Sequence, residues 1–427
     1  SSGTLIAAIG FDAPALSTGA LFYLVSSTLA GGAMFICVIA ILSHQFPDAK
    51  ERGRAFALWG VISGVGLGFG PIIGGLIVAI SSWTWVFLVY VPLSGLSFAL
   101  AVVAIEESRD PHAKKLDIWG LVALSLAVFG LAFYITQGAE LGFTGLPGLG
   151  VLAATILSFI AFVAIERWVA HPMFDFSVFK IRNFSGAIIG CVGMNFSFWP
   201  FMIYLPIYFQ GALGYDSTAA GLALLAYTVP FLVMPPIAER LLMRYEARII
   251  IPLGMFIIGL GFHLMTAGAG LAQASWLTMF PGALIAGVGL GLTTTPATNT
   301  TTASVPSNRA GMASGIDVSA RLISLAINIA VMGVVLVEGV RWSLKTAFPV
   351  VEPARLRALA ETVAAGNLAP PADLASHASN GALRSALVNG FQWVTLYGGL
   401  GAWALAAISF AIFAARPASC VVGKASQ

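Results

Sequence analysis

Long apolar stretches, separated by short charged segments, dominate the sequence. A helix needs about 20 mostly apolar residues to cross the hydrocarbon core of a bilayer. The apolar segment 1–11 is too short to cross and is interpreted as the end of a further helix. The remaining stretches predict eleven complete spans, at 19–43, 55–81, 83–105, 118–139, 146–165, 183–210, 217–238, two within 249–304, 310–337 and 385–415.

Lys and Arg residues fall in alternate connections between these predicted spans. If the spans alternate in direction, one side of the membrane carries 15 of the 21 Lys and Arg residues. The short connections on the other side carry none, the one long connection at 338–384 carries five, and Arg321 lies within a span. Cytoplasmic connections carry the excess of Lys and Arg in membrane proteins, and long connections cross regardless of charge. The richer side is therefore predicted to face the cytoplasm.

Composition excludes several classes of protein. Hydrophobic residues make up 58% of the chain and charged residues only 9%, against about 25% charged in soluble domains. This excludes an ordinary soluble enzyme and a disordered chain. The net charge of +3 gives no reason to expect a nucleic-acid partner. The three cysteines form neither a CxxC motif nor a Cys/His pair, so we expect no metal site and no cofactor. The prediction is an all-α, multi-pass protein of the cell membrane, with the lipid bilayer as its partner.

Three blocks are expected along the chain. Residues 1–105 form a helical bundle, residues 106–182 contain two spans between charged connections, and residues 183–427 contain six spans. The long connection at about 338–384 is predicted to lie outside the cytoplasm. Its segment 352–365 has helix-forming residues at apolar spacing, which favours a short interfacial helix. The alternative is a solvated cover without a specific role.

The sharpest local motif is a glycine-rich run within the span at 55–81. Gly66, Gly70 and Gly74 recur every four residues and share one helix face, while Pro71 and Gly75 complete the motif. Gly60, Gly64 and Gly68 form a second stripe beside it. Stripes of this kind let two helix backbones approach closely in a membrane, and generic helix packing would explain the spacing alone. We expect Pro71 to kink the helix, because it lacks a backbone donor.

Together with the Trp-Thr-Trp-Val-Phe sequence at 83–87, this run resembles the antiporter motif in the fifth helix of the major facilitator superfamily. The segments 204–215, 281–291 and 309–321 are similar to stretches of the EmrB/QacA-type drug–proton antiporters within that superfamily. The resemblance implies a major facilitator bundle of fourteen helices. Because the motif lies here in the third apolar segment, we expect two helices and part of a third to be absent before residue 1. The spans at 118–139 and 146–165 would be the pair inserted between two six-helix halves.

By this resemblance the function is secondary active transport, namely export of small hydrophobic or cationic compounds by proton antiport with alternating access. The alternatives are a transporter of another solute, such as a metabolite or siderophore, with different or no proton coupling, and a membrane protein that transports nothing. The sequence departs from the family pattern at two places, which bear on proton coupling and on gating. Val25 stands where the family's fourth helix carries an Arg associated with proton coupling. In the connection after the span at 217–238, Glu239 and Met243 replace the usual Gly and Asp.

Ionisable residues within spans are costly and therefore mark candidate functional sites. Asp317 and Arg321 are four residues apart on one helix face and can pair. The pair is either a structural contact or part of a gate between the two halves. His263 lies within a span and could carry a proton near neutral pH, or it could simply be a packing residue.

A candidate substrate cavity is predicted from aromatic and amide side chains in the spans at 183–210 and 217–238. Aromatic walls with few polar groups suit large apolar or cationic ligands, although an aromatic belt at the lipid interface would have the same composition. Its residues are Asn195, Phe198, Trp199, Tyr204, Gln210 and Tyr227.

Sequence motifs of enzymes are missing. The chain has no HExxH, no GxSxG and no Walker sequence, so we expect neither an enzyme nor an ATP-driven pump. The expected partners are a small hydrophobic or cationic substrate and protons, and the expected state is a monomer.

Overall fold

The computed structural model describes residues 38–39, 41–43, 45–46, 48–104, 117–169, 176–271, 273–306, 309–349, 351–368 and 380–414. These residues form helices and no strands. The predicted remnant at 1–11, most of the span at 19–43, and Val25 lie outside them. The helices are α3 (Ala49–Ile80), α4 (Trp83–Leu88), α5 (Tyr90–Ala104), α6 (Ile118–Leu141), α7 (Leu146–Trp168), α8 (Arg182–Ile207), α9 (Ser217–Tyr245), α10 (Ala247–Ala269), α11 (Trp276–Ala303), α12 (Ala310–Ala347), α13 (Pro353–Ala364) and α14 (Asn380–Ala414).

Eight of the described helices are long and apolar enough to cross a membrane: α6, α7, α8 with the π-helical turn Tyr208–Ala212 that extends it, α9, α10, α11, α12 and α14. They lie where eight of the eleven spans were predicted. The predicted spans at 55–81 and 83–105 correspond to α3 and to α4 with α5. An all-α membrane bundle is therefore confirmed.

Short polar residues fix where several helices begin. The side chain of Asp48 accepts hydrogen bonds from the backbone N–H groups of Lys50 and Glu51, ahead of α3. Asp117 caps α6 and Asp216 caps α9 in the same way. These caps satisfy donors that the first helical turn leaves without an intrahelical partner. These three helices thus begin at polar groups that suit the membrane surface.

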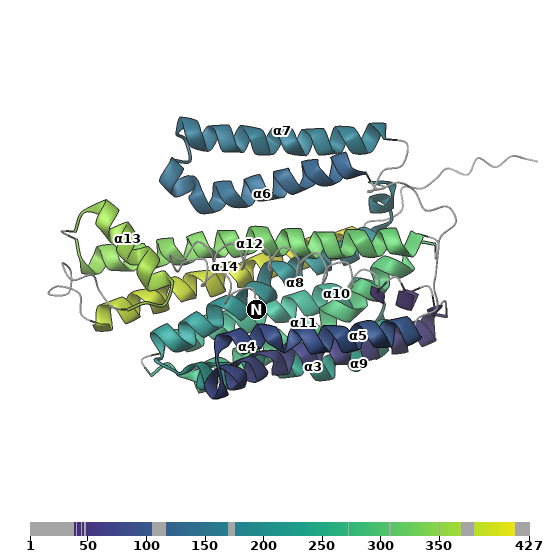
Figure 1. Ribbon diagram of the computed structural model, residues 1–427, viewed down its shortest axis with the longest axis horizontal. Helices are drawn as coiled ribbons and strands as arrows, with labels where there is room; N and C mark the ends of the chain where they lie inside the picture. Colours follow the sequence, from purple (N-terminus) through teal and green to yellow (C-terminus); the bar gives the residue numbers. More distant parts are fainter. Residues whose placement is uncertain are drawn as a thin grey trace, which may run out of the picture.

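Helices α8 to α12 and α14 pack together, and we call them with α13 the C-terminal bundle (Figure 1). Its interior is a large apolar cluster to which α8, α9, α10, α11, α12 and α14 all contribute. Glycines allow the closest approaches. A Cβ atom on Gly261 of α10 would lie 2.5 Å from the backbone nitrogen of Ala286 on α11. Helix packing in a membrane relies on such close approach, because lipid supplies no hydrophobic drive between helices.

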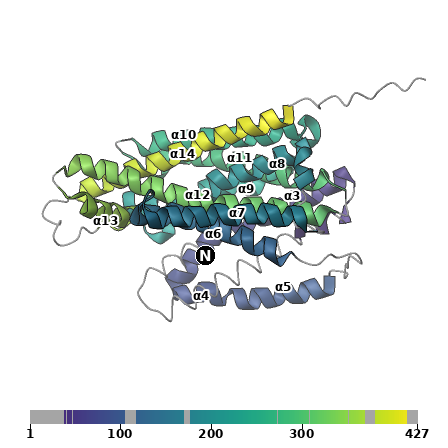
Figure 2. The same cartoon turned by 90° about the horizontal axis from the view of Figure 1, so that it is seen from above.

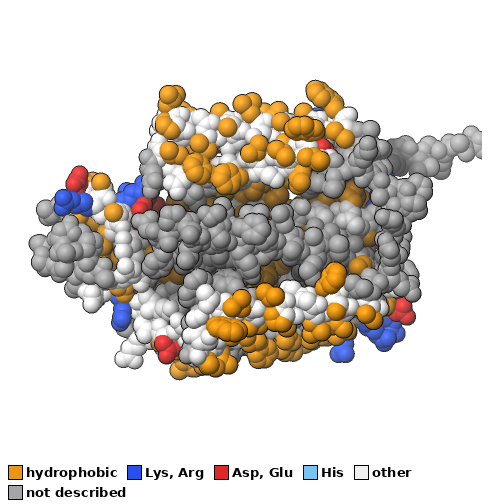
Figure 3. All heavy atoms as spheres, viewed as in Figure 1, with side chains coloured by type: hydrophobic (Ala, Val, Ile, Leu, Met, Phe, Trp, Pro, Cys, Tyr) orange, Lys and Arg blue, Asp and Glu red, His pale blue; other side chains and the backbone are white. Residues whose placement is uncertain are grey.

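Two further groups of helices flank the C-terminal bundle. Helix α3 packs along α9, and the α6–α7 hairpin contacts the bundle through α12. The hairpin and the α3–α5 group lie on opposite sides of the C-terminal bundle in Figure 1. Figure 2 shows α5 set apart from the helices of that bundle. Figure 3 shows hydrophobic side chains along the lengths of these helices and charged side chains gathered toward the ends.

The long connection before α14 is more helical than its sequence predicted. Helix α12 continues to Ala347, ten residues past the predicted end of its span, and α14 begins at Asn380. The predicted helix at 352–365 is confirmed as α13. Its apolar side chains Leu356, Leu359, Ala360 and Val363 are buried in the core of the C-terminal bundle. These side chains therefore face protein, where the prediction of an interfacial helix would have them face the membrane surface.

Candidate functional site

The predicted pair of Asp317 and Arg321 forms an ion pair inside the C-terminal bundle. Arg321 Nε lies 3.1 Å from Asp317 Oδ2, and the Asp317 side chain is completely buried. Both residues sit on one face of α12, because residues four apart in a helix are neighbours. A buried pair needs further hydrogen bonds to offset the cost of removing two charges from water.

Those hydrogen bonds come from α8 and α11. The Cys191 thiol donates to Asp317 Oδ1 at 2.7 Å, and Arg321 Nη2 donates to Thr298 Oγ1 at 2.6 Å and to Cys191 Sγ at 3.0 Å. Arg321 Nη1 lies 3.6 Å from Met194 Sδ. Three helices thus meet in one polar cluster, which we call the α12 ion-pair cluster (Cys191, Met194, Thr298, Asp317, Arg321). Sequence reasoning missed its first three members, although the threonine-rich run 293–302 signalled a polar stretch of helix.

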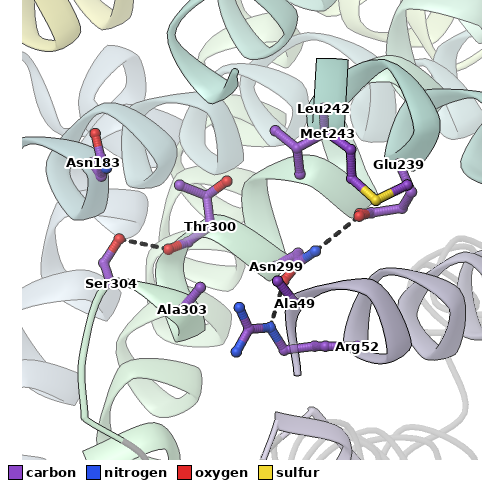
Figure 4. Close-up of a pocket in the computed structure, with 10 residues that line it drawn as sticks. All are labelled: Ala49, Arg52, Asn183, Glu239, Leu242, Met243, Asn299, Thr300, Ala303 and Ser304. Atoms are coloured by element: carbon purple, nitrogen blue, oxygen red, sulfur yellow. Dashed lines mark hydrogen bonds between the residues drawn. The ribbon is translucent and has the colours of Figure 1, made fainter. Parts of the chain in front are cut away.

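A second polar site lies where α3 meets the C-terminal bundle, at the end where α3 begins and α9 and α11 end. Arg52 Nε donates to Asn299 Oδ1 at 3.0 Å, and Asn299 Nδ2 donates to Glu239 Oε2 at 2.8 Å (Figure 4). We call these three residues the inter-bundle link. Glu239 is only 2% exposed. Among the described residues, its other carboxylate oxygen has no hydrogen-bond partner.

A cavity of about 230 Å³ adjoins this link. In Figure 4 the Arg52 side chain extends toward it from α3, while Asn299, Thr300 and Ser304 reach it from the end of α11. Asn183, at the start of α8, lines another part of its wall. The cavity therefore has a guanidinium, a carboxylate and several neutral polar groups in its wall. Arg52, Asn183 and Asn299 were not predicted as site residues, and Glu239 was noted only as a departure from the family pattern.

The two glycine stripes of α3 differ in what they contact. A Cβ atom on Gly60 would lie 2.5 Å from Pro235 Cβ, and one on Gly64 would lie 2.8 Å from Leu232 Cα, both in α9. At Gly66, Gly70 and Gly74, no described atom lies within 4 Å of such a Cβ. The stripe that carries the α3–α9 contact is thus the second one. The first stripe, which defines the antiporter motif, faces away from the described helices.

The predicted aromatic residues are largely packed against one another. The rings of Phe198 and Tyr227 stack with centroids 4.0 Å apart, and the Tyr227 hydroxyl donates to the Phe198 carbonyl at 3.0 Å. Tyr204 is buried and its hydroxyl donates to the Ile329 carbonyl of α12 at 2.8 Å. Trp199 is half-buried at the edge of this apolar cluster. These contacts join α8 to α9 and α12.

The predicted amide and imidazole groups lie apart from one another. Asn195 is buried on α8 and donates to the Cys191 carbonyl at 2.8 Å, which places it one turn from the α12 ion-pair cluster. Gln210 is exposed on the π-helical turn. His263 is half-buried on α10, stacks on Trp403 with ring centroids 4.1 Å apart, and donates through Nδ1 to the Gly259 carbonyl at 2.7 Å. Its contacts are with α10 and α14, so it does not join Asp317 and Arg321.

Comparison with known proteins gives relatives that are named for drug resistance. The chain is 29% identical over 340 residues to the multidrug resistance protein Stp of Mycobacterium tuberculosis, covering 78% of this chain and 62% of Stp. It is 30% identical over 318 residues to the quinolone resistance protein NorB of Staphylococcus aureus, covering 73% of this chain and 68% of NorB. The chain thus spans less than two thirds of the length of Stp.

The sequence profile of the Major Facilitator Superfamily matches residues 1–327, which is more than three quarters of the 427-residue chain. This match includes α3 with both glycine stripes, the α6–α7 hairpin, the helices α8, α9 and α11, and the part of α12 that carries Asp317 and Arg321. Its described part is an all-helical membrane bundle, as the resemblance in the sequence implied. This multi-pass membrane protein belongs to the Major Facilitator Superfamily.

Proposed function

We propose that the full-length protein is a monomeric secondary active transporter that exports small hydrophobic or cationic compounds in exchange for protons. The observation that carries this proposal is membership of the superfamily together with relatives named for multidrug and quinolone resistance. Two bundles would rock about a central site and open it to each side of the membrane in turn. No enzymatic activity is part of the proposal.

The contact between α3 and α9 supports the rocking mechanism. It joins the helices before residue 105 to the C-terminal bundle along the glycines Gly60 and Gly64. An interface made by glycine against backbone and proline needs few interlocking side chains, so two such helices can separate without rearranging the cores on either side. Separation of this kind is what alternating access requires.

The proposed substrate contacts are the predicted residues Asn195, Phe198, Trp199, Tyr204, Gln210 and Tyr227. Of these, Trp199 and Gln210 are accessible in the described part of the chain. The stacked pair of Phe198 and Tyr227 would hold the wall behind them in place. We assign gating or proton coupling to Asp317, Arg321 and His263. The motion of α3 would depend on the antiporter-motif residues Gly66, Gly70, Pro71, Gly74 and Gly75.

The test is efflux of a fluorescent cationic dye from cells that express the full-length protein, with and without a proton uncoupler. We expect export against a concentration gradient that stops when the proton gradient collapses. Export that continues unchanged after uncoupling would refute proton antiport. Absence of any export, with the protein correctly inserted, would count against a drug transporter and favour the alternative of another solute.

A further inference from the structure

Helix α8 carries a buried proline, Pro200, within its membrane-spanning length. Proline has no backbone N–H, so the carbonyl four residues before it loses its helical hydrogen bond. In α8 that carbonyl belongs to Phe196. A neighbouring helix must satisfy such a carbonyl, because the lipid core offers no donor.

Asn328 of α12 supplies the missing donor. Its side chain is completely buried, and its Nδ2 donates to the Phe196 carbonyl. The Tyr397 hydroxyl of α14 donates to Asn328 Oδ1 at 2.9 Å, which fixes the orientation of the amide. We call Asn328, Tyr397 and the Phe196 carbonyl the α8 clamp. It satisfies the carbonyl that Pro200 leaves free, through a side chain that a third helix holds in place.

A second contact holds α8 on the other side of the proline. Tyr204, one turn after Pro200, donates its hydroxyl to the Ile329 carbonyl at 2.8 Å. Asn328 and Ile329 are adjacent in α12, so one short stretch of α12 contacts α8 both before and after Pro200. A proline bends a helix, and contacts on both arms determine the angle between them.

This bend sets the direction of two side chains that the proposed function assigns to the substrate. Asn195 precedes the clamped residue Phe196, and Trp199 precedes Pro200. A change in the bend would turn this part of α8 and move both side chains together. Binding groups need support that keeps them within a fraction of an ångström of their productive positions.

We propose that Asn328 is a positioning residue for substrate binding, which fixes the bend of α8 by completing the hydrogen bond that Pro200 removes. Its effect on binding rests on the proposed transport function, whereas the bend is a property of the structure itself. The proposal has a sharp consequence. If Pro200 is replaced by Ala, α8 regains its own N–H donor to Phe196 and no longer depends on Asn328.

The first experiment measures the concentration dependence of cationic dye export by the full-length protein. Asn328→Leu removes the donor at similar side-chain size. We expect it to raise the apparent KM about tenfold, the effect of leaving a buried carbonyl unpaired, with the maximal rate per folded protein within about twofold. In the Pro200→Ala background, the same substitution should change the KM by less than about twofold. A merely structural role would lower the amount of folded protein without this change in KM.

Two matched controls isolate the clamp. Asn389→Leu removes another half-buried amide, which joins α14 to Ser343 of α12 at 3.0 Å, and should leave the KM unchanged. Pro206→Ala restores the other N–H that a proline removes from α8. Because Pro206 affects the Met202 carbonyl and not Phe196, this background should not relieve the effect of Asn328→Leu.

The second experiment measures the bend without substrate, in the full-length protein reconstituted in liposomes. Spin labels are placed at the exposed positions Asn183→Cys, at the start of α8, and Thr218→Cys, just beyond its other end. Cys37 and Cys420 are replaced by Ser, and the buried Cys191 is kept. We expect Asn328→Leu to shift and broaden the distance distribution, and to have no such effect once Pro200 is Ala.

The proposal is overturned if Asn328→Leu raises the KM by the same factor with and without Pro200→Ala, or if it leaves both the KM and the distances unchanged. Folding is checked by protection of Cys191 from a maleimide. Should Asn328→Leu fail that check, Tyr397→Phe takes its place. It loses only the hydroxyl that orients the amide, and we expect a rise in KM of about threefold with the same dependence on Pro200.

The two experiments separate this proposal from the transport function. Distances that respond to Asn328→Leu in a protein that exports no dye would reject only the transport proposal. Normal dye export with an unchanged KM and unresponsive distances would reject only the role of Asn328.

Discussion

At the scale of single residues, the α12 ion-pair cluster shows how the chain accommodates two charges within an apolar bundle. Arg321 and Asp317 are neighbours on α12, but their remaining hydrogen bonds come from Cys191 and Thr298 on other helices. Removing one partner of such a pair leaves an uncompensated buried charge, whereas removing both leaves none.

We therefore expect Asp317→Ala to destabilise the protein by about 3–5 kcal/mol, because Arg321 is left buried without its carboxylate. The double variant Asp317→Ala with Arg321→Met should regain a large part of that loss. Thermal unfolding of the purified protein, followed by the reactivity of the Cys191 thiol as it becomes exposed, measures both effects. A double variant as unstable as Asp317→Ala would show that the charges themselves are not the cause.

At the scale of helices, the glycines of α3 form two stripes, of which one packs against α9 and the other faces away from the described helices. Gly60→Ala would bring a methyl group to 2.5 Å from Pro235, so α3 and α9 must move apart. We expect a loss of stability of about 1–3 kcal/mol, in the range of overpacked cores. Gly66→Ala, six residues away on the same helix, is the matched control, with an expected change below about 0.5 kcal/mol. Unfolding temperatures in detergent compare the two, and equal effects would contradict the assigned packing face.

The helix α13 offers a second test at this scale. Leu359 is buried in the core of the C-terminal bundle, whereas Arg355 on the same helix is exposed. We expect Leu359→Ala to cost about 2–4 kcal/mol through the cavity it leaves, and Arg355→Ala to cost less than about 0.5 kcal/mol. Limited proteolysis between α12 and α14 measures the undocking of α13. If α13 instead rested on the membrane surface, Leu359→Ala would leave proteolysis unchanged in detergent.

At the scale of the whole molecule, the distribution of Lys and Arg predicts how the bundle is oriented. Met243 lies near the arginine-rich end of α9, and Leu271 lies at the opposite end, where α10 leads into α11; both are exposed. We expect an impermeant maleimide to label Leu271→Cys on intact cells and Met243→Cys only after permeabilisation. Labelling of Met243→Cys on intact cells would reverse the predicted orientation and place the inter-bundle link outside the cytoplasm.

Much of the fold could be predicted because the apolar length of a segment predicts a spanning helix without reference to the rest of the chain. The apolar length of 118–139 predicts α6 regardless of what surrounds it, since a spanning segment must satisfy its own backbone in lipid. The i,i+4 spacing of Asp317 and Arg321 likewise predicts their pairing within one helix. The antiporter motif identified the family, although the glycines that contact α9 proved to be those of the neighbouring stripe.

The sequence by itself therefore determined the helices, the membrane class, the family and the pairing of Asp317 with Arg321, because all of these rest on local spacing or on motifs within one segment. Only the tertiary structure brought Cys191 and Thr298 to that pair, and Arg52 to Asn299 and Glu239. Arg52 and Asn299 are 247 residues apart in the chain. The rotation of each helix about its axis decides such contacts, and close packing against several neighbours at once sets that rotation.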